Sequence, residues 1–302
     1  MKNIRLTLAY DGTNFVGWQV QPNGVSVQSV VERAIEKLTG LPAKLRVAGR
    51  TDSGVHAIGQ VANFETESDL PIEAYRDGLQ HHLPTDIVVR DACEVGSEFH
   101  ATYSVKRKRY RYVIHNSRIP NPLIRNFAWN YHGQLDTTAM HHAAQTLLGE
   151  HDFRSFESHF PNKATSVRTV IEVRVHRTSG WPIWMPETKD RTDTTVGEGE
   201  AIAEPMISSI AARQEPRPPD FEATSNEDYR ASESDGEFIC FDIVANGFLY
   251  NMVRAIVGTL IRVGRQDWNA EDVSRIISAK DRSQAGETAP PHGLYLVYVD
   301  YE

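Results

Sequence analysis

The chain has 302 residues, a length that suggests two domains. Its hydrophobic content of 40% is enough for ordinary cores, and no apolar run reaches the roughly 18 residues of a membrane span. The first residues include Arg5 and lead into a strand pattern, so we expect no signal peptide. Cys93 and Cys240 lie far apart in apolar runs, which favours free thiols in a reducing cytoplasm over a disulfide or a zinc site.

The net charge of −8 is unevenly distributed along the chain. Residues 181–237 hold fourteen Asp and Glu against five Lys and Arg, a net of −9, which leaves about +1 for the remainder. Within that remainder, residues 106–112 form a dense basic and aromatic cluster, KRKRYRY. The overall negative charge therefore does not argue against a polyanionic partner.

Hydrophobic spacing in the first hundred residues predicts the order β-α-β-β-α-β, which is the ferredoxin-like arrangement. Ser26 is the expected N-cap of the first helix, and Gly40 follows its end. The predicted elements are strands over 4–10, 44–48, 55–66 and 87–95, and helices over 27–38 and 71–83.

The second half repeats this mixture of strands and helices in a less regular order. The predicted elements are strands over 109–115, 169–175, 238–245 and 294–301, and helices over 137–148 (N-cap Asp136), 248–261 and 270–279. Residues 181–236 are rich in Pro, Glu, Asp, Thr and Ser and show no period, so we expect a disordered or loosely packed insertion. The prediction is an α+β protein with domains at 1–104 and 105–302.

A polar loop over residues 49–54 lies between two β-prone runs and carries Arg50 and Asp52 between two glycines. Asp-Ser-Gly is common turn chemistry, so a solvated hairpin is one interpretation. In the other, Asp52 is a positioned carboxylate that Arg50 or another cation keeps ionised. For His56, just beyond this loop, we expect a structural role instead of proton transfer.

Two further features admit both a plain and a functional interpretation. Tyr110 and Tyr112 on an exposed strand need no special role; alternatively, with the basic residues around them, they form a phosphate-contacting ridge with an aromatic platform for looped RNA. Arg254, on the helix over 248–261, either extends to solvent or is the buried partner of a carboxylate.

Segments spread over nearly the whole chain resemble the TruA-type tRNA pseudouridine synthases. The resemblance rests on YDG at 10–12, FVGWQ at 15–19, GRTDSGVHA at 49–57, FHA at 99–101, KRYRY at 108–112, FLYNMVR at 248–254 with Gly258, and GLYL at 293–296. The insertion over 181–236 departs from this family, whose connection there is usually shorter.

The resemblance implies an isomerase that converts uridine to pseudouridine on the 3′ side of the tRNA anticodon stem-loop, at the family positions 38, 39 and 40. It implies two α+β domains with a cleft between them, a homodimer, and no cofactor or metal. Asp52 would be the nucleophile, Tyr110 would lie against the target uracil, and Arg254 would pair with Asp52. Leu294 and Leu296 would wall the pocket. We predict substrate contacts by a basic set: Arg50, Lys108, Arg109 and Arg111.

Two interpretations from other classes remain open. A non-catalytic RNA-binding protein would use the basic strand but tolerate Asp52→Asn in every assay. A ribosyl hydrolase would use the same carboxylate and release free uracil, so product analysis separates it from an isomerase.

Overall fold

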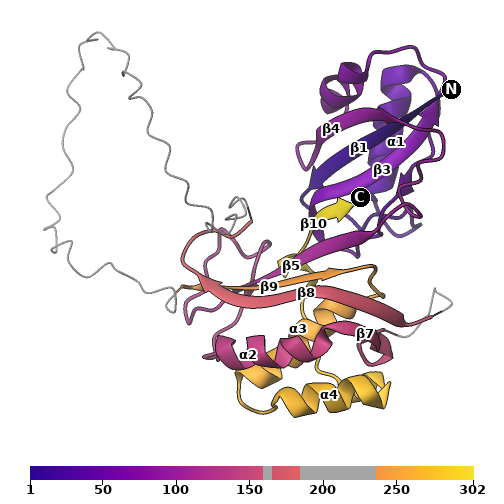
Figure 1. The fold of residues 1–302 in the computed structure, drawn as a ribbon. Coiled ribbons are helices and arrows are strands. Elements are labelled where there is room, and N and C mark those ends of the chain that lie inside the picture. Colours follow the sequence, from indigo (N-terminus) through magenta and orange to yellow (C-terminus); the bar gives the residue numbers. More distant parts are fainter. Residues whose placement is uncertain (159–164, 184–235) are drawn as a thin grey trace, which may run out of the picture.

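The computed structural model describes residues 1–158, 165–183 and 236–302, shown as coloured ribbon in Figure 1. Their main strands form one sheet in the order β4-β1-β3-β10-β5-β9-β8-β7, with the short β2 beside β3 and β6 beside β5. Neighbouring strands in this part of the chain are antiparallel except for the pairs β10–β3 and β5–β6. The predicted α+β class with mainly antiparallel strands is confirmed.

The boundaries of the elements are as follows. The strands are β1 (Lys2–Tyr10), β2 (Arg46–Val47), β3 (His56–Thr66), β4 (Ile87–Val95), β5 (Arg107–His115), β6 (Trp129–Asn130), β7 (Gly149–Asp152), β8 (Val167–Thr178), β9 (Phe238–Ala245) and β10 (Leu294–Asp300). The α-helices are α1 (Val27–Thr39), α2 (Thr137–Ala144), α3 (Met252–Gly264) and α4 (Ala270–Ala279).

Local sequence signals set most of these boundaries in the first half. The Ser26 side chain accepts the Ser29 amide at the start of α1, and Gly40 ends the helix with φ 72°, as predicted. The helix predicted over 71–83 is shorter, and it winds as a π-helical turn at Ala74–Gly78. This stretch buries Tyr75 and Leu79 against the sheet, and these are its only fully buried side chains.

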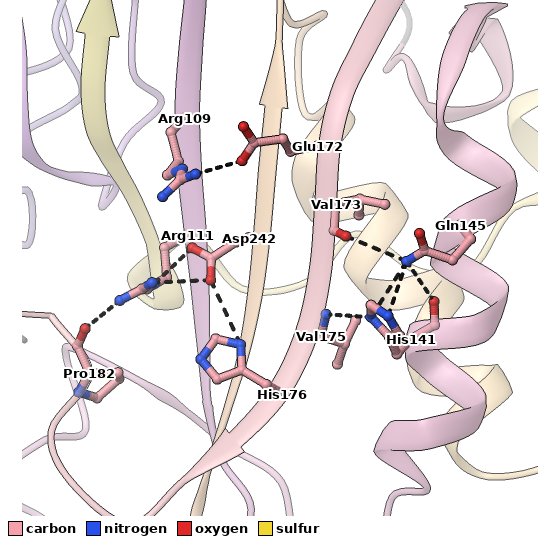
Figure 2. Close-up of polar contacts among 10 residues, drawn as sticks. All are labelled: Arg109, Arg111, His141, Gln145, Glu172, Val173, Val175, His176, Pro182 and Asp242. Carbon is pink, nitrogen blue, oxygen red and sulfur yellow. Dashed lines mark hydrogen bonds and ion pairs between the residues drawn. The ribbon is translucent and has the colours of Figure 1, made fainter. Parts of the chain in front are cut away.

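The helices cover one side of the sheet. Figure 1 shows α2, α3 and α4 below β5, β9 and β8, and the buried faces of α1 to α4 belong to one continuous hydrophobic cluster. Beyond Val170, the outer edge of β8 has no strand partner among the described residues, and α2 covers it instead. The Val175 amide donates to His141 Nδ1 at 3.2 Å, and the Gln145 side chain donates to the Val173 carbonyl (Figure 2).

The last strand joins the two halves of the chain. β10 lies between β3 and β5, and Leu296 is the register partner of both Ala57 and Tyr110. The proposed division into domains 1–104 and 105–302 therefore has a strand of the second domain paired with a strand of the first. No helix of the described residues is long and apolar enough to cross a membrane.

The predicted insertion lies outside the described residues except at its two ends. Trp181 packs edge-on against Phe238 with ring centroids 5.6 Å apart, and Ile183 is buried in the same small cluster. The prediction of disorder concerns residues 184–235, which the structure does not describe.

Candidate active site

The Asp52 loop packs against the end of β1 and the segment that follows it. The Trp18 amide donates to the Thr51 carbonyl at 3.0 Å, and the Thr51 hydroxyl shares a hydrogen bond of 2.7 Å with the Tyr10 hydroxyl. Gly17 has φ +102°, and a Cβ there would lie 2.6 Å from the Thr51 oxygen. The close backbone approach explains why a glycine occupies this position.

His56, just after the loop, connects two other segments of backbone through its ring. It is buried, its Nε2 lies 2.9 Å from the Asn126 carbonyl, and its Nδ1 accepts the Gly12 amide at 3.0 Å. Its ring also stacks on Tyr295, with centroids 4.8 Å apart. Because both ring nitrogens hold backbone groups, His56 has the structural role that the sequence suggested.

The Asp52 carboxylate faces the guanidinium of Arg254. Arg254 Nη1 lies 3.6 Å from Asp52 Oδ2, and the two side chains are 15% and 23% exposed. Burial raises the pKa of Asp52, and the charge of Arg254 and its hydrogen bond oppose that rise. Of the two cations considered for this carboxylate, the structure places Arg254 beside it, from a helix about 200 residues further along the chain.

Two neutral acceptors hold Arg254 in this position. Its Nε donates to the Ala289 carbonyl and its Nη1 to Asn251 Oδ1, both at 2.7 Å. Asn251 is the N-cap residue of α3 and has a left-handed backbone with φ 60°. No local pattern in the sequence assigns a role to Asn251 or Ala289, because only the folded chain shows which oxygen atoms a distant arginine meets.

Tyr110 lies on the same side of the sheet as the loop. Its buried ring packs edge-on against Phe248, with centroids 4.8 Å apart. Burial raises the pKa of Tyr110, and the nearby Tyr10 and Asp52 add to that rise. Leu294 and Leu296 are buried opposite Tyr112 and Tyr110 on the adjacent strand. Tyr110 lies near Asp52 and Tyr112 near Arg254, so these two buried rings and their strand partners give the ion pair an apolar neighbourhood.

Among the four basic residues expected to bind substrate, Lys108 and Arg50 lie near the loop. The Lys108 ammonium donates to the Ala48 carbonyl, directly before the loop. Arg50 belongs to the loop itself and is exposed. Lys108 alternates with Tyr110 along β5, so both side chains extend from the face that carries the site.

Arg109 and Arg111 extend from the opposite face of β5. Arg109 binds Glu172 at 2.7 Å, and Arg111 binds both oxygens of Asp242 at 2.8 and 3.1 Å (Figure 2). The two arginines therefore do not join the Asp52 site, although they are neighbours of Tyr110 in sequence. Their contact with substrate stays a prediction.

The arrangement brings together a partly exposed carboxylate, a cation that opposes its protonation, and an apolar wall. Such a carboxylate is suited to covalent catalysis in its ionised form, which the charge of Arg254 favours against the effect of burial.

Comparison with known proteins gives the family. The family model described as tRNA pseudouridine synthase matches residues 7–104 and 143–302. Proteins named tRNA pseudouridine synthase A are similar over the full length of both chains, with 38% identity in Acetivibrio thermocellus and 39% in Thermoanaerobacter pseudethanolicus. The chain belongs to the tRNA pseudouridine synthase family. Members of this family are isomerases that convert uridine to pseudouridine.

The two matched regions carry Asp52 and Arg254, the two partners of the ion pair. Tyr110 and Lys108 lie in the interval between these regions, which the full-length relatives nevertheless cover. The unmatched interval, residues 105–142, thus contains all of β5 and the start of α2.

Proposed function

We propose that this chain isomerises uridine to pseudouridine in the anticodon stem-loop of tRNA, with Asp52 as the covalent nucleophile. The observation that supports this role is the ion pair between Asp52, from the loop before β3, and Arg254, from the first turn of α3. A carboxylate that is partly buried and opposed by one cation can attack an electrophilic carbon and later leave.

The reaction makes and breaks bonds within one nucleoside. The bond between N1 of uracil and C1′ of ribose breaks, the base rotates, and C5 of uracil bonds to C1′. The hydrogen on C5 leaves as a proton and N1 gains one, so the product is an isomer of the substrate. The carboxylate of Asp52 serves this sequence whether it attacks the sugar or the base ring.

The surroundings of Asp52 fit an unstacked base. Extracting a base from a stem-loop costs a few kcal/mol, and stacking on an aromatic ring returns about 1–3 kcal/mol. Tyr110 and Phe248 supply aromatic rings, and Leu296 supplies an apolar wall. Arg50 and Lys108 supply positive charge beside the loop for the phosphate backbone.

The decisive variant is Asp52→Asn. It preserves the size of the side chain and removes the nucleophile, so we expect tRNA binding to remain while tritium release from tRNA labelled at C5 of uridine falls at least about 10⁴-fold. The exposed Asp77, which pairs with Arg76, provides the control Asp77→Asn, which should retain full activity. Substantial tritium release by Asp52→Asn would exclude the proposed nucleophile.

Nucleoside mapping of tRNA after incubation with the protein locates the product. We expect pseudouridine at positions 38, 39 or 40, whereas free uracil would indicate a ribosyl hydrolase. A homodimer is part of the same proposal, and sedimentation of the protein with and without tRNA tests it.

A further inference from the structure

Asn251 has an unusual backbone at the start of the helix that carries Arg254. It is one of three non-glycine residues with positive φ among the described residues, the others being Gln266 and Lys280. A left-handed backbone is unfavourable for a residue with a Cβ, and asparagine tolerates it better than most. The side chain of Asn251 makes no hydrogen bond that caps α3, so helix capping does not explain this residue.

The side chain of Asn251 is instead directed at Arg254. A guanidinium only donates hydrogen bonds, so the amide oxygen of Asn251 must face Arg254 Nη1, at 2.7 Å. The amide nitrogen donates to the Ser158 hydroxyl at 2.9 Å, which keeps the amide in this orientation. The same Nη1 atom lies 3.6 Å from Asp52 Oδ2.

We propose that Asn251 is a positioning residue, whose side chain holds the Arg254 guanidinium against the Asp52 carboxylate. This inference rests on the proposed role of Asp52. With the Ala289 carbonyl on Nε, the Asn251 oxygen fixes the plane of the guanidinium at two points. Both acceptors are uncharged, so the positive charge of Arg254 is left for Asp52, whereas a carboxylate at position 251 would compete for it.

The charge of Asp52 depends on every ionisable group nearby. Burial raises the pKa of Asp52, and Arg254 is the group that opposes this rise. If Asn251 no longer holds the guanidinium, Arg254 opposes this rise less effectively. The pKa of Asp52 then increases, and a smaller fraction of Asp52 is ionised at acidic pH. Among the described residues, Tyr110 from β5 faces Asp52, while Tyr112 from β5 and His292 from the segment before β10 face Arg254.

A glycine at position 251 separates positioning from backbone strain. Glycine adopts positive φ freely, so Asn251→Gly relieves the backbone while it removes the hold on Arg254. The control is Gln266→Gly, which relieves the same kind of backbone at an exposed position beyond the end of α3. Ser158→Ala removes only the bond that orients the Asn251 amide, and it serves if Asn251→Gly does not fold.

The first measurement does not depend on activity. Carboxyl carbon NMR of protein labelled in aspartate follows the titration of Asp52, which Asp52→Asn identifies by the loss of its signal. We expect the pKa of Asp52 to rise in Asn251→Gly, to rise less in Ser158→Ala, and to stay unchanged in Gln266→Gly. An unchanged Asp52 titration in Asn251→Gly, with the fold intact, would overturn the inference.

The second measurement is the pH profile of tritium release from tRNA. In Asn251→Gly we expect kcat/KM to fall about tenfold at pH 6 and less at pH 8, because fewer molecules carry an ionised Asp52 at acidic pH. A purely structural role would lower the melting temperature and reduce kcat/KM equally at both pH values, which contradicts positioning. A wild-type protein that releases no tritium would refute the proposed function, while the NMR titration would still decide the role of Asn251.

Discussion

Tyr110 combines a buried ring with a hydroxyl that does not ionise at neutral pH. Burial and the neighbouring Tyr10 and Asp52 raise its pKa. A hydroxyl with a raised pKa remains protonated, so it can donate a hydrogen bond or a proton but cannot act as a base at neutral pH. The ring and the hydroxyl of Tyr110 are thus expected to serve different steps, base stacking and proton handling.

The variant Tyr110→Phe separates these two contributions. The phenyl ring preserves stacking, so we expect Kd for tRNA to stay within about twofold, while kcat falls about 10²-fold through loss of the hydroxyl. Single-turnover tritium release measures the step, and filter binding measures affinity. Tyr103→Phe, at a highly exposed position, is the control and should match the wild type. Normal turnover in Tyr110→Phe would remove the hydroxyl from the mechanism.

At the scale of elements, the loop over residues 49–54 depends on the segment beneath it. The Thr51 carbonyl accepts the Trp18 amide, the Thr51 hydroxyl shares a hydrogen bond with the Tyr10 hydroxyl, and Gly54 takes φ +76° at the end of the loop. Close backbone contact at Gly17 leaves no room for a side chain. Residues more than thirty positions earlier therefore set the geometry of Asp52. Their close backbone contact with the loop is the structural reason for the glycines in that segment.

Gly17→Ala tests this dependence. It introduces an unfavourable backbone and a clash with the Thr51 carbonyl, so we expect a loss of about 3 kcal/mol in the free energy of unfolding. Gly40→Ala is the matched control, since Gly40 has φ +72° but nothing within 4 Å of its Cβ position, and about 1 kcal/mol should be lost there. Urea denaturation measures both, and equal losses would show that the contact with Thr51 is unimportant.

Sequence patterns predicted elements where the signal was local. Ser26 and Asp136 cap α1 and α2 as expected, and α4 and β9 have the predicted boundaries. The four-residue β7 was missed: the glycine expected to end the helix over 137–148 begins a strand, and α2 itself ends at Ala144. A short edge strand is specified by its pairing with the next strand, β8, and is too short to show a period of its own.

The candidate site was predictable in its residue types and only partly in its geometry. Alternation along β5 implied that Arg109 and Arg111 would face away from Tyr110, yet the dense cluster of charges suggested one common surface. In the structure the two arginines extend from the face opposite Tyr110, where Glu172 and Asp242 bind them (Figure 2). The side chains that a residue meets on the adjacent strands depend on strand order, and no local pattern contains that information.

At the scale of the whole molecule, β10 brings the two halves of the site together. It pairs in parallel with β3, which follows the Asp52 loop, and in antiparallel fashion with β5, which carries Tyr110. The segment just before β10 provides the Ala289 carbonyl that holds Arg254. The last strand therefore joins the strand that follows the Asp52 loop to the strand that carries Tyr110, and the segment before it holds Arg254.

β9 and β8 pair on the side of β5 that faces away from β10. Thr178 and Phe238 are register partners, so the residues between them form one long hairpin connection whose ends are already adjacent. We expect deletion of residues 187–235 to leave a folded and active protein, because the ladder from β8 to β9 and the Asp52 site remain complete. Melting temperature and tritium release measure fold and activity separately.

A longer deletion gives the control for this prediction. Removing residues 181–235 also takes away Trp181, which packs on Phe238, and Pro182, whose carbonyl accepts a hydrogen bond from Arg111. We expect this variant to melt at a lower temperature than the shorter deletion, since it loses buried apolar surface and leaves a guanidinium with one partner fewer. If the shorter deletion folds normally but releases no tritium, residues 187–235 take part in tRNA binding or catalysis. In that case the acidic segment belongs to the function and not only to the loop connection.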